Sequence, residues 1–345
     1  MKTEAAVLVE LGKPLEVVSI GLPTLKPGQV LVELAYSGVC HTQLLEARGR
    51  RGPDSFLPHC LGHEGAGEVR EVGAGVTKVK AGDEVVLTWM KGSGADIPGT
   101  TYDWDGRKVN AGGMTTFQRL AVVSENRLVP RPAGLAPREA ALLGCALPTG
   151  FGMVFNVLRL EKDRTLAVFG AGGIGLSAVA AARAAGAVVV AAVDPREDRR
   201  AAAMTMGATH AFAPGPDLAS ELKKLVPGGF DAAIEASGRP AVMAAALACV
   251  RARGGCAVIA GNAHAGETMA LDPKELNAGK RLLGTWGGDN EPDRDFPRWA
   301  GLLAERRIVL GPLTAAVYPL SRVNAALDDL ESGRALRPLL DLAAG

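Results

Sequence analysis

The sequence predicts an α/β protein of two domains, in which a β-rich domain is joined to a doubly wound parallel sheet. Three observations predict this class. The 345 residues are enough for about two domains of ordinary size. Short apolar runs bounded by turn residues fill the first part of the chain, whereas apolar runs alternate with alanine-rich stretches from about residue 148. The 44 glycines, in a chain with only 4% aromatic residues, require many tight turns.

The first part of the chain is predicted to form short strands. Its apolar runs, among them 4–9, 29–36 and 116–123, are separated by Pro-Gly, Gly-Ala-Gly and Ala-Gly-Asp turns. The stretch 91–113 has neither helical nor strand periodicity, so we expect a loop or lobe there. Long loops in compact domains are often functional.

The second part is predicted to form βαβ units. Its apolar runs alternate with helical stretches, which is typical of a parallel sheet with helices on its faces. These runs are 167–169, 188–193, 232–235 and 257–260. The two parts of the chain are therefore different domains.

The charge balance and the cysteine count exclude several classes of function. Lys plus Arg (38) and Asp plus Glu (37) leave a net charge of +1, so no basic field attracts nucleic acid or an acidic membrane. Five scattered cysteines, an odd number, are typical of a reducing compartment. Glu4 and Glu10 interrupt the apolar stretch that a signal peptide needs, so we expect a cytoplasmic protein.

A glycine motif predicts a dinucleotide site. The run Gly170-Ala171-Gly172-Gly173-Ile174-Gly175 follows a predicted strand at 165–169 and precedes a helical stretch at 176–185. Its first glycine suits a tight turn, the second lets backbone approach a pyrophosphate, and the third allows helix and strand to pack closely. The helix N-terminus then offers free N–H groups to the phosphates.

An acidic residue after the next strand favours NAD as the dinucleotide. Asp194 lies 19 residues beyond Gly175, where a carboxylate accepts hydrogen bonds from the adenosine ribose and repels a 2′-phosphate. Arg196 and Arg199 lie near enough to weaken this preference, so NADP stays open.

Two cysteines and a histidine are candidate metal ligands. Cys40, His63 and Cys145 would give zinc two thiolates and one imidazole and leave a fourth position for water or substrate, the arrangement of a catalytic site. The long gaps between these residues are not a zinc-finger signature. Taken separately, a cysteine is more often a small buried apolar residue than a ligand.

Several motifs in order carry a resemblance to a known family. They are Cys40-His41-Thr42, Gly62-His63-Glu64-Gly65-Ala66-Gly67, Val72-Gly73 with Gly75-Val76, Gly82-Asp83 with Val85, Gly144-Cys145 with Thr149-Gly150, and the glycine motif. Together they resemble the zinc-dependent alcohol dehydrogenases of the medium-chain dehydrogenase/reductase superfamily. The resemblance implies a GroES-like catalytic domain of residues 1–147 and 286–345, a Rossmann domain of residues 148–285, and an active site in the cleft.

The resemblance also implies roles for single residues. Cys40, His63 and Cys145 match the zinc ligands, Glu64 an acid that assists ligand exchange, and Thr42 the hydroxyl at the alcohol. Thr149 matches a contact of the nicotinamide and Ile174 the side chain behind its ring, while Arg337 and His41 match contacts of the cofactor's phosphates. Zinc would lower the pKa of a bound alcohol, Thr42 would take its proton, and hydride would pass to NAD or return in the reverse reaction.

Three departures from the family pattern qualify these implications. Residues 91–113 contain no cysteine, so we expect a single catalytic zinc per chain, no structural zinc, and a lobe held by Trp89, Ile97, Tyr102 and Trp104. Gln43 replaces the aspartate that holds the ligand histidine, although glutamine can still accept that hydrogen bond. Leu45 replaces a histidine of the proton relay in several members, so protons would leave through ribose and water or through His41.

The remaining candidates and the rival functions stay open. His59 and Cys60 precede the ligand histidine and suit packing or the lining of the substrate pocket. The resemblance implies a small alcohol or carbonyl substrate and a homodimer or homotetramer formed through edge strands near 284–287. The rivals are a dehydrogenase of a sugar, cyclitol or secondary-metabolite alcohol, a zinc-free quinone or enoyl reductase relative, and a dinucleotide-binding protein without catalysis.

Overall fold

The chain forms two compact units in a computed structural model that describes residues 1–305 and 308–343. Unit 1 comprises Met1–Cys145, Glu291–Gly301 and Leu313–Gly345, and unit 2 comprises Ala146–Asn290 and Leu302–Pro312. The predicted division placed all of 286–345 in the first domain. By their contacts, residues 286–290 and Leu302–Pro312 group with unit 2.

Five short strands of unit 1 form a closed barrel. In the order of the barrel they are β1 (Lys2–Leu8), β2 (Glu16–Gly21), β7 (Thr100–Trp104), β8 (Arg107–Gly112) and β4 (His59–Cys60). Strands β7 and β8 form a hairpin within 91–113, so the expectation of a loop without strands was wrong for this part of the lobe. Tyr102 and Val109 point into the barrel core, and the exposed residues between them are polar.

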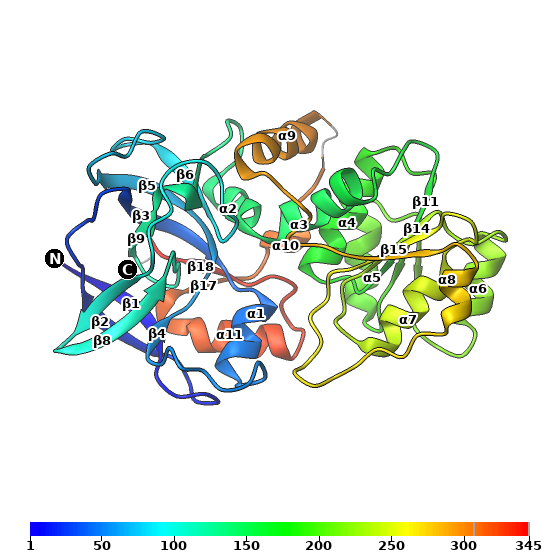
Figure 1. Ribbon diagram of the computed structural model, residues 1–345, viewed down its shortest axis with the longest axis horizontal. Helices are drawn as coiled ribbons and strands as arrows, with labels where there is room; N and C mark the ends of the chain where they lie inside the picture. Colours follow the sequence, from blue (N-terminus) through cyan, green and yellow to red (C-terminus); the bar gives the residue numbers. More distant parts are fainter. Residues whose placement is uncertain (306–307, 344–345) are drawn as a thin grey trace. The chain divides into compact units, whose positions relative to one another are not determined.

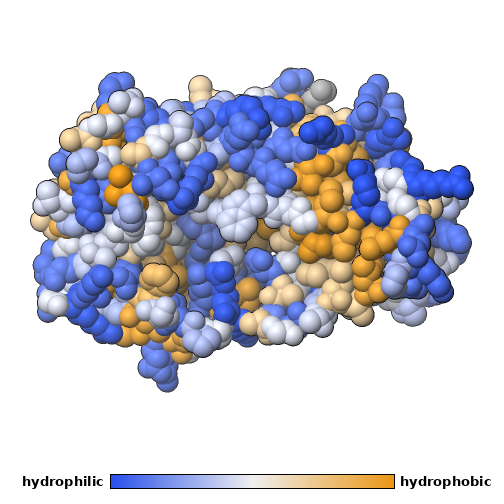
Figure 2. Space-filling model, viewed as in Figure 1, coloured by the Kyte–Doolittle hydropathy of each residue, from blue (hydrophilic) through white to orange (hydrophobic). Residues whose placement is uncertain are grey.

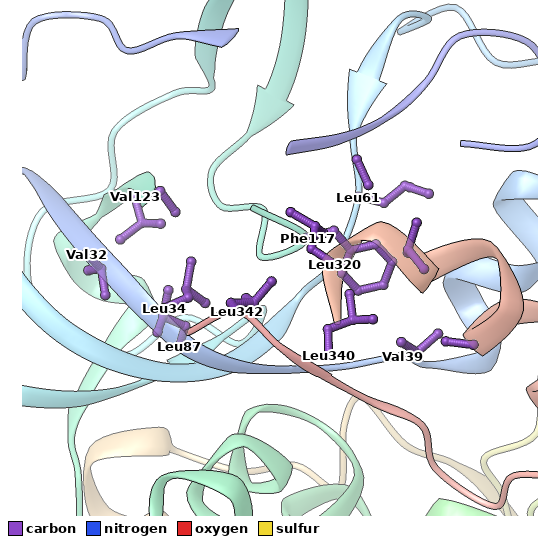
Figure 3. Packing of buried hydrophobic residues seen from close by; sticks show 14 of the residues in the cluster. Val32, Leu34, Val39, Leu61, Leu87, Phe117, Val123, Leu320, Leu340 and Leu342 are labelled. Carbon is purple, nitrogen blue, oxygen red and sulfur yellow. The ribbon is translucent and has the colours of Figure 1, made fainter. Parts of the chain in front are cut away.

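A second sheet of unit 1 contains the end of the chain. Its order is β10 (Leu128–Pro130), β6 (Glu84–Thr88), β5 (Glu64–Val72), β3 (Gln29–Gly38), β18 (Leu339–Asp341) and β17 (Val317–Pro319), with β9 (Leu120–Ser124) paired to β3. Figure 3 shows Leu320, Leu340 and Leu342 from the C-terminal segment packed among Val39, Leu61 and Phe117 of the N-terminal part. The C-terminal segment therefore completes the core of unit 1.

Short helices flank the sheets of unit 1. They are α1 (His41–Ala47), α2 (Pro137–Ala140) and α11 (Val323–Glu331), with single 3-10 turns at Glu125–Arg127, Ala141–Gly144 and Leu320–Arg322. Helices α9 (Pro292–Glu305) and α10 (Gly311–Thr314) run from one unit into the other along the chain. Helix α11 packs on α1, and Glu331 pairs with Arg48 directly after α1 at 2.8 Å, which fixes the helix that follows Cys40.

Unit 2 is built on a parallel sheet, as the sequence predicts. Its strand order is β13 (His210–Phe212), β12 (Val189–Val193), β11 (Thr165–Phe169), β14 (Ala232–Glu235), β15 (Cys256–Ile259) and β16 (Arg281–Gly284). The direction of the strand order reverses between β11 and β14, and ligands of such sheets bind beyond the carboxyl ends of the strands at this point.

Helices surround this sheet, as Figure 1 shows for α4, α5 and α7. The helices are α3 (Ala146–Gly152) with the π-helical turn Met153–Val157, α4 (Gly173–Ala184), α5 (Glu197–Thr205), α6 (Leu218–Leu225), α7 (Pro240–Cys249) and α8 (Pro273–Asn277). Figure 2 shows hydrophobic residues gathered on the face that unit 2 turns to the viewer.

Among the described residues no single helix is long and apolar enough to cross a membrane. One bent pair of helices, Pro137–Gly144 with Ala146–Val157, is long and apolar enough by length and composition alone.

Candidate functional site

Cys40, His63 and Cys145 come together in unit 1 although they are far apart in the sequence. Cys40 is the N-cap of α1, His63 lies just before β5, and Cys145 follows the 3-10 turn at Ala141–Gly144. Their ligand atoms lie within 4.8 Å of one another, and His63 Nε2 is 3.3 Å from Cys145 Sγ. No other cluster of three or more such residues occurs among the described residues.

The donor set fits a zinc ion. Tetrahedral zinc with Zn–S of about 2.3 Å and Zn–N of about 2.0 Å needs ligand atoms about 3.5 to 3.8 Å apart, close to the spacing found here. A hydrogen bond from Cys145 lowers the pKa of the Cys40 thiol well below its ordinary value, against the effect of burial. Three protein ligands leave a fourth position for a small molecule.

The other cysteines are not suited to this chemistry. Burial raises the pKa of Cys60 and of Cys249 to about 12, and burial also raises the pKa of Cys256. These thiols therefore stay protonated near neutral pH and act as small apolar residues.

Glu64 and Arg337 form a buried ion pair in the same unit. Arg337 donates to Glu64 Oε1, and the two side chains are 5% and 0% exposed. Gly38 makes room for Glu64, because a Cβ on Gly38 would lie 2.4 Å from Glu64 Oε1. Arg337, which the resemblance assigns to the pyrophosphate, thus lies beside the acid that follows the ligand histidine.

The first turn of α1 carries the remaining candidates of unit 1. The hydroxyl of the half-buried Thr42 lies 3.9 Å from Cys40 Sγ. His41 is exposed at the start of the helix, and Leu45 is buried. The side chain of Gln43 contacts His63 Nδ1 at 2.5 Å, so the residue that replaces the family's aspartate does touch the candidate ligand.

A cavity of about 500 Å³ opens beside these residues, within unit 1. Gln43 and His63 lie on its wall, and so does His59, as the sequence suggested for a pocket-lining residue. His59 Nε2 lies 2.8 Å from Asp54 Oδ2, and Asn110 donates to the carbonyl oxygen of Phe56 at 2.6 Å. Arg51 and Glu46 add an ion pair of 2.8 Å to the wall.

The backbone around the glycine motif of unit 2 leaves little or no room for a side chain at Gly170 and Gly175 and is open at Gly172. Gly170 has φ of +92°, and a Cβ there would lie 2.9 Å from the backbone nitrogen of Ser237. A Cβ on Gly175 would lie 1.8 Å from the carbonyl oxygen of Gly170, so glycine lets α4 begin this close to β11. Apart from Gly172 itself and its neighbours in the sequence, no described atom lies within 4 Å of a Cβ added at Gly172, so the backbone there is open to a ligand.

The other candidates of unit 2 surround this motif. Asp194, directly after β12, accepts from the backbone nitrogens of Ala171 and Arg196 at 2.9 and 3.0 Å. Arg199 lies 3.9 Å from the same carboxylate. Gly173 and Ile174 form the first turn of α4, and Thr149 lies in α3, which packs against α4.

Sequence reasoning missed some residues that shape these sites. Asp54 stands in no motif, and its partner His59 follows at a spacing that belongs to neither helix nor strand. The resemblance named Arg337 as a contact of the pyrophosphate, but it did not predict the contact with Glu64, which lies 273 residues away in the sequence.

Comparisons with known proteins match parts of both units. A model of the alcohol dehydrogenase GroES-like domain matches residues 26–133, and a model of the zinc-binding dehydrogenase domain matches residues 173–305. S-(hydroxymethyl)glutathione dehydrogenase of Synechocystis sp. is 32% identical over 368 aligned positions, which cover 99% of this chain and all of that protein.

Solved structures show the same similarity along the whole chain. Benzyl alcohol dehydrogenase from Acinetobacter calcoaceticus has a TM-score of 0.89 with 26% identity, and each chain is covered to 99%. An alcohol dehydrogenase zinc-binding domain protein from Burkholderia ambifaria has a TM-score of 0.88 with 30% identity, again with 99% of each chain covered.

These findings, with the Cys-His-Cys cluster and the open glycine turn, identify an oxidoreductase that uses zinc and a nicotinamide cofactor to interconvert alcohols and carbonyl compounds. The chain belongs to the zinc-dependent alcohol dehydrogenases of the medium-chain dehydrogenase/reductase superfamily.

Proposed function

We propose that Cys40, His63 and Cys145 hold one zinc ion per chain, at which a small alcohol is oxidised with NAD or the matching carbonyl compound is reduced. The single observation that carries this proposal is the convergence of the three ligand atoms within 4.8 Å. When bound, zinc supplies a Lewis acid to the alcohol oxygen and the nicotinamide supplies the hydride acceptor.

In this proposal side chains of unit 1 take the proton of the alcohol and assist exchange at the metal. The hydroxyl of Thr42, beside Cys40, takes the proton of the alcohol and passes it on. Glu64 is the acid that assists exchange at the metal, and Arg337 keeps it in place by the buried ion pair. The route by which the proton leaves Thr42 runs through the cofactor ribose and water or through His41.

The cofactor is held by unit 2 in this proposal. The open backbone at Gly172, with Gly173 at the start of α4, offers N–H groups to the pyrophosphate. Asp194 accepts from the adenosine ribose and favours NAD, while Arg199 beside it keeps some use of NADP open. Ile174 and Thr149 contact the nicotinamide end, and Arg337 contacts the pyrophosphate.

The cavity of unit 1 receives the rest of the alcohol. Its wall combines charged and amide groups that offer both donors and acceptors, namely Glu46, Arg51, Asp54, His59 and Asn110. Apolar side chains of Leu11, Phe56, Leu61 and Met114 lie on the same wall, so the cavity suits alcohols that combine an apolar part with further hydroxyl groups. A panel of primary, secondary, cyclic and sugar alcohols with NAD or NADP, followed by formation of the reduced nicotinamide, compares these classes.

The proposal also includes assembly into a homodimer or homotetramer. Strand β16 is the edge of the parallel sheet and pairs only with β15 among the described residues. Leu283 on this strand and Trp286 just after it are 36% and 78% exposed. An exposed apolar edge strand is a template for pairing with another chain, here a second copy.

The test of the zinc site is the substitution Cys40→Ser. We expect this variant to lose both its zinc and its turnover of alcohols, because a serine hydroxyl does not replace a thiolate ligand. The matched control is Cys256→Ser, which changes a buried cysteine of β15 outside the cluster and leaves zinc near one per chain. An active Cys40→Ser variant without zinc, or a wild type with two zinc ions per chain, contradicts the proposal.

A further inference from the structure

The amide of Gln43 lies between two groups that each need an acceptor. Gln43 is 2% exposed and stands in the first turn of α1. Its Oε1 accepts from the backbone N–H of Cys40 at 3.1 Å, and its Nε2 lies 2.5 Å from His63 Nδ1. The two contacts are made by opposite ends of the amide.

The protonation of a metal-binding imidazole decides what Gln43 has to supply. His63 turns Nε2 toward Cys145 Sγ, so Nε2 is the atom that would bind the metal, and a ligand nitrogen carries no proton. The proton of the neutral ring then lies on Nδ1, which becomes a donor toward Gln43. The backbone N–H of Cys40 is a donor as well.

A carboxamide has only one oxygen for these two donors. In the orientation described above, the oxygen serves Cys40 and the NH₂ group faces the N–H of His63. In the flipped orientation the oxygen serves His63 and the NH₂ group faces the N–H of Cys40. Either way two donors face each other in a buried place, and a buried donor without an acceptor costs about 1 to 3 kcal/mol.

We propose that Gln43 is a positioning residue that weakens the hold of this site on zinc, so that the ion exchanges more readily than in a site with a carboxylate at this position. The inference rests on the ligand assignment made under the proposed function. A carboxylate of the same shape would accept from Cys40 with one oxygen and from His63 with the other. Carboxylates that hold a ligand histidine in this way change metal affinity by about 10- to 100-fold.

The experiment measures release of zinc, without reference to activity. Zinc-loaded wild type and variants are mixed with excess chelator, and free zinc is followed with a metal-sensitive dye. We expect Gln43→Glu to lose zinc about tenfold more slowly than the wild type. We expect Gln43→Met, which removes the amide without adding charge, to lose zinc faster than Gln43→Glu and no more slowly than the wild type.

A second buried glutamine of unit 1 provides the matched control. Gln29 Oε1 also accepts from a backbone N–H, that of Lys26 at 3.0 Å, and its Nε2 donates to the hydroxyl of Thr100. Gln29→Glu therefore adds a buried carboxylate at a backbone N–H without touching His63, and we expect the rate of zinc release to stay that of the wild type.

The outcomes separate this inference from the ligand assignment. A wild type that binds no zinc contradicts the assignment of the ligands. Equal release from the wild type and Gln43→Glu, or slower release from Gln43→Met than from the wild type, overturns the role of Gln43 alone. Should Gln43→Glu fail to fold, judged by circular dichroism, Gln43→Asp takes its place as the carboxylate variant: slower release than from the wild type supports the proposal, and equal or faster release overturns it.

Discussion

Glu64 is a fully buried carboxyl group beside two candidate thiolate ligands. Burial raises the pKa of Glu64, and the guanidinium of Arg337 acts against that rise. Glu64 Oε2 has no hydrogen-bond partner among the described residues, whereas Oε1 accepts from Arg337. A buried charge without its partner is strongly destabilising, so Arg337 allows an acid to remain next to the ligand histidine.

The hydroxyl of Thr42 leads to a prediction at the scale of one residue. Thr42→Val keeps the shape of the side chain and removes the group that takes the proton, so we expect kcat for alcohol oxidation to fall about 100-fold. Zinc content, measured on the same sample, stays that of the wild type, because Thr42 is not a ligand. Thr42→Ser keeps a hydroxyl and retains most of the activity. If Thr42→Val kept full kcat, another group would have to take the proton.

Single residues were predictable where a motif ties them to a local backbone geometry. The glycines at 170, 172 and 175 belong to one turn, and the shape of that turn dictates each of them. The contacts of Gln43 with His63 and of Arg337 with Glu64 depend instead on which distant segments meet, and only the family resemblance pointed to the first of them. No short-range pattern predicts that the amide of Gln43 faces both Cys40 and His63, because His63 lies 20 residues farther on.

At the scale of elements, carboxylates tie the lobe at 91–113 to the rest of unit 1. Glu125 Oε1 accepts from the backbone nitrogens of Thr77 and Lys78 at 2.7 and 2.8 Å, and its Oε2 accepts from Ala95 at 2.8 Å. Asp293 accepts from the backbone nitrogen of Ser93 at 2.6 Å. These contacts hold the start of the lobe to the sheet by its backbone, while Tyr102 and Trp104 pack in the barrel.

Glu125 predicts a pH-dependent stability. Burial alone would raise the pKa of Glu125, but the three backbone N–H donors outweigh burial and lower it. A lowered folded-state pKa gives stability that is present above the unfolded value of about 4.3 and is lost as the pH falls through the folded value. We expect Glu125→Gln to reduce the free energy of unfolding by about 2 kcal/mol at pH 7.

Urea unfolding at several pH values checks this expectation. The difference between the wild type and Glu125→Gln should begin to shrink below about pH 4.3, because the unfolded chain then binds a proton at Glu125 that the folded chain does not. It is lost once the pH falls below the lowered folded-state pKa. Glu84→Gln, which changes an exposed partner of Arg131, is the control and should cost at most about 0.5 kcal/mol. If the difference in the free energy of unfolding stays constant down to pH 3, the charge of Glu125 does not hold the lobe.

The hairpin in the lobe shows why one element escaped prediction. Asp105 and Gly106 have φ of +49° and +89°, the backbone of a two-residue hairpin turn that favours Asp-Gly. The flanking strands alternate correctly, but Thr100 and Ala111 are small inward residues that give a weak apolar signal. The parallel strands of unit 2 were easier to predict, since their apolar runs are buried on both faces.

At the scale of the whole molecule, the chain builds unit 1 from both of its ends. Strands β17 and β18 complete a sheet begun by β3, and Leu340 packs among residues of the N-terminal part (Figure 3). Composition predicted two domains, but only the family resemblance suggested that the first closes with the C-terminal segment. Pairing between segments this far apart has no local sequence signal, because it depends on loop closure over almost the full chain.

We predict that copies of this chain assemble through the exposed edge of unit 2. In the described part of the chain β16 pairs with β15 alone, so its other edge offers backbone groups and the side chain of Leu283. Two copies related by a twofold axis would pair these edges antiparallel. We expect the wild type to sediment as a dimer or as a tetramer of such dimers, and Leu283→Arg to sediment at a smaller mass. An arginine there would place two like charges in one apolar contact, and desolvating unpaired charges is unfavourable. Met204→Arg on α5, where the side chain is 46% exposed, is the matched control and should keep the wild-type mass. A Leu283→Arg variant with the mass of the wild type, or a monomeric wild type, would show that the edge of β16 is not the interface.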